Sequence, residues 1–282
     1  MMRVAVTGGS GKLGRAVVDD LLAHGHEVHI LDTAVPRPEH RGRFSRVDLT
    51  DFGQVVSALT GLDDRFERLD AVVHLAALPA PGVAPNPTVF TNNVTSSYNV
   101  FAAARVAGIH NVVWASSETL LGLPLDTPPI AIPIDETHPP RPESSYSLGK
   151  LVDETIAAEF CRWDPRLKMI GLRFSNVMEP EDYARFPAFD TDPMLRKWNL
   201  WGYIDARDGA QAVRKALEYA PRGLEIFIIA NADTVMSRPS AELAAEVFPT
   251  VPVTRELRGT ETLLSIDKAR KLLGYEPQHS WR

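Results

Sequence analysis

The chain has 282 residues, of which 44% are hydrophobic and 23% are charged, and this composition provides a core for one large domain or two small ones. The formal net charge of -6 argues against a general nucleic-acid binder, and no apolar run approaches the length of a membrane span. The single cysteine, Cys161, excludes an intrachain disulfide, and cysteine usage together with the lack of a signal-peptide pattern predicts a cytoplasmic protein.

Strand and helix signals alternate over most of the chain. Short apolar or β-branched runs predict strands at residues 4–7, 27–31, 44–47, 71–75, 111–115, 169–174 and 225–230. Apolar residues at helical spacing predict helices at 12–24, 51–59, 93–107, about 144–160 and 209–219. This alternation predicts an α/β fold with a doubly wound parallel sheet of the Rossmann type.

The rhythm weakens after residue 176, where the chain becomes irregular and aromatic, and its last fifty residues predict small helices and loops. We therefore expect a sheet-forming domain at 1–176 plus about 203–232. A small lid for the substrate is expected at 177–202 plus 233–282. Proline-rich loops at 79–87 and 124–142 follow two predicted strands, so they lie at the carboxyl edge of the sheet, where ligands bind.

A glycine-rich loop follows the first predicted strand and opens the first predicted helix. It consists of Gly8, Gly9, Ser10, Gly11, Lys12, Leu13 and Gly14. Glycine permits a tight turn and a close approach of the backbone to phosphate, and the helix N-terminus offers free N–H groups to an anion. The loop therefore predicts a site for the pyrophosphate of a dinucleotide.

Asp32 ends the second predicted strand. A carboxylate at this position accepts hydrogen bonds from the adenosine ribose and repels a 2′-phosphate, which favours NAD over NADP. Arg37 lies nearby and could reach a phosphate, so NADP stays the less favoured alternative.

Tyr146 and Lys150 lie four residues apart in a predicted helix, hence on one face. A phenol has an ordinary pKa of about 10, so a tyrosine that exchanges protons near neutral pH needs a nearby cation to stabilise its phenolate. Ser116 and Ser117 end a strand upstream, at the same ligand-binding edge. These residues predict a proton-transfer site beside the dinucleotide.

With these residues in place, the chain resembles the extended short-chain dehydrogenases/reductases of the NAD-dependent epimerase/dehydratase group over nearly its whole length. The matching segments, in chain order, are TGGSGKLG, VDLTD, HLAA, NNV, SSE, YSLGK, LRFSNV and YIDARDGA. The resemblance implies Tyr146 as general acid/base, Lys150 as its tuning cation and a ribose contact, and Ser117 as donor to the substrate oxygen. Ser116 stays open as the alternative donor.

The resemblance also implies the remaining contacts. For the cofactor, these are Asp48 and Leu49 beside the adenine, Leu75, Ala76 and Ala77 at its centre, Asn93 behind the site, and Phe174 near the nicotinamide. For the substrate, they are Glu118, Asn176 and Arg207, where Arg207 is open between a substrate contact and an ion pair with Asp208. His74 is expected to be structural, no metal is expected, and a homodimer through the helices at 93–107 and 144–160 is implied.

Three reactions are compatible with this family. A dehydratase needs an Asp-Glu pair after the catalytic hydroxyl, and Glu118-Thr119 stand there instead, so we rank it last. An epimerase needs a nucleotide pocket, but the C-terminal region is short, and Leu120-Leu121-Gly122 replaces the familiar VYG. Compactness and the segment SNVMEPEDY resemble uronate dehydrogenases, which favours a dehydrogenase acting on a free sugar or sugar acid.

Two points stay open at this stage. Arg141, Arg173 and Arg185 are candidates for contact with a substrate carboxylate or phosphate. A protein that binds or senses NAD without catalysis is the alternative from another class; such proteins usually lose the tyrosine or the lysine, and both are present here.

Overall fold

The structure is a computed structural model that describes residues 1–37, 42–61 and 68–282. One seven-stranded sheet runs in the order β3-β2-β1-β4-β5-β6-β9, and every pairing in it is parallel. Its strands are β1 (Arg3–Thr7), β2 (Glu27–Asp32), β3 (Arg43–Arg46), β4 (Ala71–His74), β5 (Asn111–Ser117), β6 (Lys168–Phe174) and β9 (Gly223–Ile229). The predicted doubly wound sheet is confirmed, and the strand order reverses between β1 and β4.

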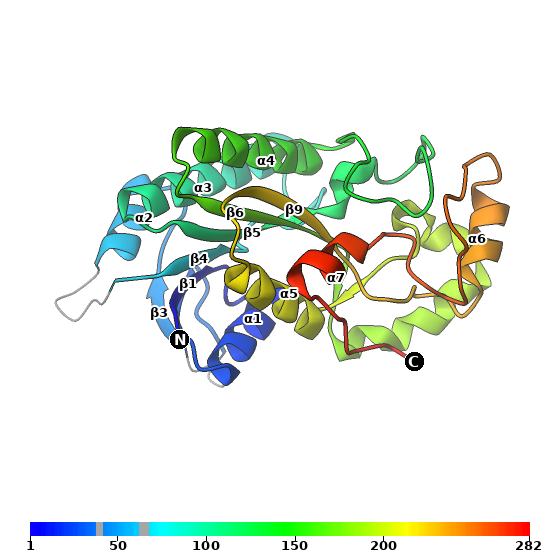
Figure 1. The fold of residues 1–282 in the computed structure, drawn as a ribbon, viewed down its shortest axis with the longest axis horizontal. Coiled ribbons are helices and arrows are strands. Elements are labelled where there is room, and N and C mark those ends of the chain that lie inside the picture. Colours follow the sequence, from blue (N-terminus) through cyan, green and yellow to red (C-terminus); the bar gives the residue numbers. More distant parts are fainter. Residues whose placement is uncertain (38–41, 62–67) are drawn as a thin grey trace.

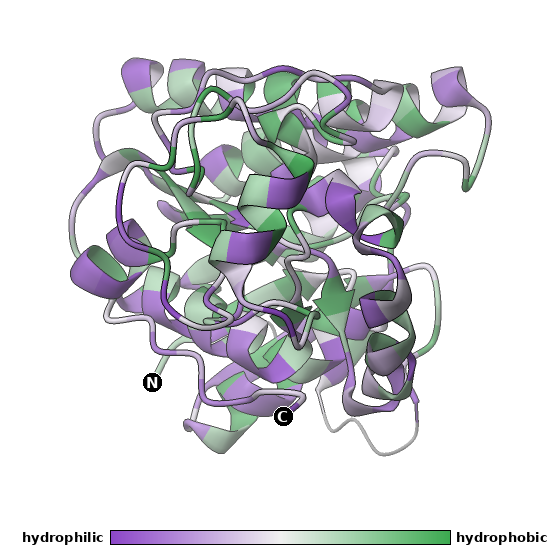
Figure 2. Cartoon of the chain, turned by 90° about the vertical axis from the view of Figure 1, so that its right-hand side faces the viewer, coloured by the Kyte–Doolittle hydropathy of each residue, from purple (hydrophilic) through white to green (hydrophobic). Residues whose placement is uncertain are grey.

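Helices cover both faces of the sheet (Figure 1). One layer contains α2 (Phe52–Thr60), α3 (Asn86–Val106) and α4 (Ser145–Trp163), and the other contains α1 (Lys12–Ala23) and α5 (Ala206–Glu218). Alternate residues of each strand point to opposite faces, so Val4 and Val6 join the core under α1 and α5, whereas Ala5 joins the core under α2, α3 and α4. Apolar residues accordingly gather on the inner strands in Figure 2.

Two helix boundaries differ from those that the sequence predicts. α3 begins at Asn86, seven residues before the predicted start, because Pro85 caps it and Pro87 lies in its first turn, where proline needs no N–H partner. Part of the proline-rich stretch is therefore helix and not loop. α4 begins at Ser145, and its cap Ser144 exchanges hydrogen bonds with Ser147, which fixes the first turn just before Tyr146.

The C-terminal part of the chain gathers at one end of the sheet (Figure 1). It contains the short parallel pair β7 (Val177–Met178) and β8 (Ile204–Asp205), three 3₁₀ helices η2 (Pro180–Thr191), η3 (Pro193–Leu195) and η4 (Lys197–Asn199), and the helix α6 (Ser240–Val247). The helix α7 (Asp267–Leu273) instead packs against β9 and α5 (Figure 1). The connection after β5 reaches this region through bridges from Ile132 and Ile134 to the C-terminal segment. The division into a cofactor domain and a lid stays a prediction.

Candidate active site

The glycine loop passes so close to its neighbours that side chains cannot be added. Gly8 has a φ of +69°, and a Cβ atom there would lie 2.6 Å from the backbone nitrogen of Ala76. A Cβ on Gly14 would lie 2.0 Å from the backbone oxygen of Gly8. No side chain caps α1 at Gly11, so the first-turn N–H groups are open to an anion.

Asp32 is joined to this loop at the end of β2. Its Oδ2 accepts a hydrogen bond from the Ser10 backbone N–H (3.0 Å), and its Oδ1 accepts one from Ala34 (3.1 Å). These contacts hold the carboxylate at the mouth of the loop. Asp48 is exposed after β3, while Leu49 beside it is buried with its backbone oxygen bonded to Asn99.

The loop after β4 is fixed from two sides. The backbone N–H groups of Leu75 and Ala76 donate to the Thr7 hydroxyl, at 3.2 and 3.3 Å. Asn93, buried on α3, accepts from the backbone N–H of Leu78 and donates to its carbonyl. Leu75 and Ala76 lie beside Gly8 of the glycine loop. The cofactor contacts of Leu75, Ala76 and Ala77 stay predictions.

The two serines at the end of β5 have different partners. Ser116 donates to Glu154 Oε1 (2.6 Å), and Glu154 also binds Arg173 through both oxygens, so Ser116 belongs to a buried structural cluster. Ser117 accepts hydrogen bonds from the backbone N–H and hydroxyl of Thr119. Of the two, Ser117 has no buried charged partner and remains the better candidate for a substrate contact.

Tyr146 and Lys150 lie on the inner face of α4, with 9% and 3% of their surfaces exposed. The Lys150 ammonium lies 5.9 Å from the centre of the Tyr146 ring and donates to the backbone oxygen of Ala115 (2.8 Å), two residues before Ser117. β5 and α4 thus bring Ser117, Tyr146 and Lys150 to one edge of the sheet. A phenol, an ammonium and a hydroxyl so placed can exchange a proton with a bound alcohol.

His74 is structural, as expected. Its ring bridges the hydroxyls of Thr7 (2.7 Å) and Ser97 (3.2 Å) inside the protein. Burial and the nearby positive charge of Lys150 lower its pKa to about 3, so the ring is neutral at physiological pH.

Glu118 is buried, and both of its oxygens are engaged. They accept from the Ser175 hydroxyl (2.5 Å) and from the Asn199 amide (3.1 Å). Burial raises the pKa of this carboxyl to about 7, although the hydrogen bonds and Arg196 oppose that shift. Glu118 joins the end of β5 to the η4 turn, and its predicted substrate contact stays a prediction, as does that of the partly buried Asn176.

Phe174 ends β6 opposite Ser117 and is 5% exposed. A Cβ on Gly209 would lie 2.8 Å from Leu13 and 3.5 Å from Phe174, so both side chains approach α5 at this glycine. The contact of Phe174 with the nicotinamide stays a prediction.

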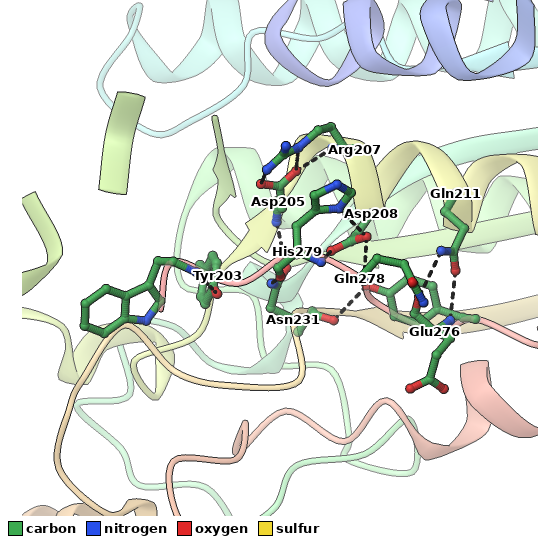
Figure 3. Close-up of polar contacts among 12 residues, drawn as sticks. Tyr203, Asp205, Arg207, Asp208, Gln211, Asn231, Glu276, Gln278 and His279 are labelled. Atoms are coloured by element: carbon green, nitrogen blue, oxygen red, sulfur yellow. Dashed lines mark hydrogen bonds and ion pairs between the residues drawn. The ribbon is translucent and has the colours of Figure 1, made fainter. Parts of the chain in front are cut away.

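Arg207 lies in a network that ties the C-terminal tail to α5 (Figure 3). It binds both oxygens of Asp205, each at 2.8 Å, whereas Asp208 accepts from the backbone of Gln278 and from His279. The ion pair of Arg207 with Asp208, one of the two alternatives that the sequence left open, is therefore wrong, because the side chain of Arg207 binds Asp205 at the helix cap. A substrate contact by Arg207 stays a prediction.

The segment after β7 meets the glycine loop through contacts that the sequence did not predict. Lys12 pairs with Asp182 (2.6 Å), and Arg15 pairs with Glu179 (2.7 Å). The partners are separated by 170 and 164 residues in the chain, so no local pattern connects them. The only signal in the sequence is one of charge: the segment EPED is acidic, whereas Lys12 and Arg15 are basic.

The three arginines that are candidates for contact with a substrate carboxylate or phosphate differ in whether their charge is already paired. Arg173 is buried and bound by Glu154, so its charge is already matched. Arg141 pairs with Glu143 on the surface, and Arg185 pairs with Asp182 while 66% of its side chain is exposed.

Within residues 1–37, 42–61 and 68–282, no group of His, Cys, Asp or Glu could hold a metal ion, and no helix is long and apolar enough to cross a membrane.

Comparisons with known proteins agree with this geometry. The family model "NAD dependent epimerase/dehydratase family" matches residues 4–230. UDP-glucose 4-epimerase 2 of rice (Oryza sativa subsp. japonica) is 32% identical over 71% of this chain, a match that spans half of the rice protein. L-arabinose 1-dehydrogenase (NAD(P)(+)) of Haloferax volcanii is 26% identical over 99% of this chain and 97% of its own length.

Solved structures show the same fold. UDP-glucose 4-epimerase of Thermus thermophilus, solved as a complex with NAD, is 26% identical with a TM-score of 0.72, over 99% of this chain and 95% of the other. A mutated uronate dehydrogenase is 23% identical with a TM-score of 0.70, over 100% of this chain and 83% of the other, a likeness that concerns the fold alone.

Proposed function

Because the chain belongs to the NAD-dependent epimerase/dehydratase family, we propose that it is an NAD-dependent oxidoreductase acting on a hydroxyl group of a sugar or sugar acid. The observation that carries this proposal is the position of Lys150, whose ammonium lies 5.9 Å from the centre of the Tyr146 ring and hydrogen-bonds to Ala115, near the end of the strand that bears Ser117. These are the groups that an alcohol needs for proton removal.

The residues of the first βα turn fit NAD. At Gly8 and Gly14 a Cβ would collide with the backbone, so only glycine fits there. The start of α1 has no side-chain cap, so its N–H groups can bind a pyrophosphate. Asp32, held by Ser10 and Ala34, suits the ribose hydroxyls and disfavours a 2′-phosphate. We therefore propose NAD, with NADP as the weaker alternative that the name of the Haloferax relative keeps open.

NAD supplies the hydride acceptor of the reaction. In our proposal, the Tyr146 phenolate takes the proton of the substrate hydroxyl as that carbon gives up its hydride and becomes a carbonyl. The Lys150 ammonium stabilises the phenolate, and Ser117 donates a hydrogen bond to the substrate oxygen. The buried cluster of Ser116, Glu154 and Arg173 keeps β5 and α4 in register beneath these groups.

Alignment lengths favour a small substrate. The Haloferax dehydrogenase aligns over 287 positions with this chain of 282 residues. The alignment with a UDP-glucose 4-epimerase of Lacticaseibacillus casei covers the same 99% of this chain but is 324 positions long. That epimerase therefore contains insertions that this chain lacks. Leu120 and Leu121, which stand where the family has a tyrosine, carry no hydroxyl, and both are fully buried. The higher identity of the rice epimerase keeps epimerisation as the second candidate.

A substrate panel tests the proposal and separates its alternatives. The protein is incubated with NAD and, in turn, with free sugars, sugar acids and UDP-sugars, while NADH and the sugar products are measured. A dehydrogenase accumulates NADH together with a lactone or ketone. Interconversion of UDP-sugars without NADH indicates an epimerase, and NAD binding without any product indicates a non-catalytic NAD-binding protein.

We also propose a homodimer through α3 and α4. Exposed apolar side chains lie on both helices, at Tyr98 (47%), Val106 (64%), Leu148 (44%) and Trp163 (48%). Pairing of the two helices with those of a second copy would cover them. Light scattering should give twice the chain mass, and Leu148→Glu should give the monomer. A cytoplasmic location stays a prediction.

A further inference from the structure

A carboxyl group lies behind the catalytic lysine. Tyr146, Lys150 and Asp153 occur at positions i, i+4 and i+7 of α4, so they form one stripe on its inner face. Asp153 is fully buried, and its Oδ2 lies 3.4 Å from the Lys150 ammonium. The ammonium is therefore near both the phenol ring, 5.9 Å from its centre, and the carboxylate.

The groups around Asp153 and Lys150 come from α3, β4, β5 and α4 itself. α3 contributes the Ser97 hydroxyl, which lowers the pKa of Asp153, and β4 contributes His74, which is neutral and hydrogen-bonds to Ser97. β5 contributes the Ala115 carbonyl to Lys150, and α4 itself contributes Glu154, whose charge Arg173 matches. Burial raises the pKa of Asp153, and the Lys150 ammonium opposes that rise. Lys150 is thus the single cation in contact with this carboxyl among the described residues.

A buried ammonium without a counter-charge is costly, and the carboxylate of Asp153 is the group that matches it here. The Ala115 carbonyl and Asp153 take two directions of the ammonium and leave a remaining N–H bond for the ribose or the phenol. The Lys150 ammonium favours the Tyr146 phenolate because opposite charges attract. The negative charge of Asp153 weakens this effect.

We propose that Asp153 is a positioning residue that holds the Lys150 ammonium and sets the pH at which the Tyr146–Lys150 pair becomes active. Its negative charge offsets part of the lysine charge at the phenol, so the phenolate forms at higher pH than it would beside an unmatched lysine. This inference rests on the proposed function, because it assumes that Tyr146 is the acid/base.

The direct test is the pH profile of Asp153→Asn, which removes the charge and keeps the shape. Asp153 and Tyr146 are separated by roughly 10 Å along the helix. A unit charge at that distance shifts a titration by about one pH unit in a protein. We expect the acidic limb of the kcat profile to move to lower pH by that amount. A limb that stays in place or moves to higher pH overturns the proposal.

A second readout does not depend on turnover. The absorbance of tyrosinate is titrated in the NAD-free protein, and the Tyr146→Phe titration is subtracted to isolate the Tyr146 transition. Asp153→Asn should lower the midpoint of that transition by about one pH unit. If no sugar is oxidised, the proposed function fails, yet this titration still decides the role of Asp153.

Two further variants complete the test. Glu159→Gln removes an exposed carboxylate from the same helix and should leave both midpoints unchanged, because water screens that charge. If Asp153→Asn does not fold, Ser97→Ala removes the hydroxyl that stabilises the carboxylate and should give a smaller shift in the same direction. Unchanged midpoints in a folded Asp153→Asn, or in Ser97→Ala when it must stand in, overturn the proposal.

Discussion

The candidate site has two sides that differ in how their charges are held. On the α4 side, Lys150 and Asp153 are 3% and 0% exposed and are enclosed by α3, β4 and β5. On the opposite side, Lys12 pairs with Asp182 across the mouth of the glycine loop while 39% of the lysine side chain is exposed. Buried charges interact strongly and keep one geometry, whereas exposed pairs are weak and screened by salt. The difference supports the proposed proton chemistry at α4 and predicts exchangeable contacts at the segment after β7.

The largest effect should come from the buried side. Tyr146→Phe removes the phenol oxygen and should lower kcat by about 10³-fold, the usual size of a lost acid/base. NAD affinity should change little, since the rest of the cofactor site is intact. Steady-state kinetics together with calorimetric NAD binding check both parts. Turnover at the wild-type rate would remove Tyr146 from the reaction.

Gly14→Ala tests the loop that separates the two sides. The added Cβ would lie 2.0 Å from the Gly8 carbonyl oxygen, so the loop must move. We expect a loss of about 1–3 kcal/mol in the free energy of unfolding, typical of overpacking, and weaker NAD binding. Gly53→Ala on α2 is the matched control, because its Cβ would meet only the exposed Asp51 carboxylate. Equal effects of both variants would contradict a tight loop.

Glu118 connects the two sides and predicts a pH effect on stability. Its pKa in the folded chain is about 7, above the ordinary value of 4.5, so the folded state binds the proton more tightly than the unfolded state. The stability that this group contributes is therefore lost as the pH rises from 4.5 to 7, by up to about 3 kcal/mol.

Glu118→Gln cannot ionise and should escape this loss. Urea unfolding at pH 5 and pH 8 is the measurement, in which the variant should gain stability relative to the wild type at the higher pH. A difference between the two proteins that is independent of pH would show that Glu118 keeps an ordinary pKa.

The smallest effect is expected on the exposed side. Asp182→Asn frees the Lys12 ammonium at the mouth of the glycine loop, so the pyrophosphate should meet a stronger positive field. Since an exposed pair contributes about 0–1 kcal/mol, we expect NAD to bind up to about fivefold more tightly at low salt, with the gain lost at high salt. Weaker binding at both salt concentrations would mean that the pair holds the loop in its binding shape.

The glycine loop and the α4 side could be predicted from the sequence because each of their motifs is local. The glycine loop, Asp32 at the end of β2, the serines at the end of β5 and the Tyr146–Lys150 spacing each require only neighbouring residues and a strand or helix end. The parallel fold places those ends together, so the site follows once the sheet is known.

The opposite side depends on contacts that no local pattern contains. The pairs of Lys12 with Asp182 and of Glu118 with Asn199 join segments far apart in the chain. The sequence places Arg207 beside Asp208, yet the cap geometry of α5 turns its side chain to Asp205. Asp153 gives no signal because one carboxylate in a polar helix is ordinary in a sequence, and its burial against Lys150 arises only when α3 and α4 are packed.

The central claim is that Tyr146 and Lys150 face the reactive ring of an NAD molecule bound on the glycine loop. A crystal structure of the chain with NAD tests it most directly. We expect the pyrophosphate on the Gly8–Gly14 backbone, a ribose hydroxyl within hydrogen-bond distance of the Lys150 ammonium, and the Tyr146 and Ser117 hydroxyls on the same side of the nicotinamide. A nicotinamide ring that lies away from both hydroxyls would contradict the account.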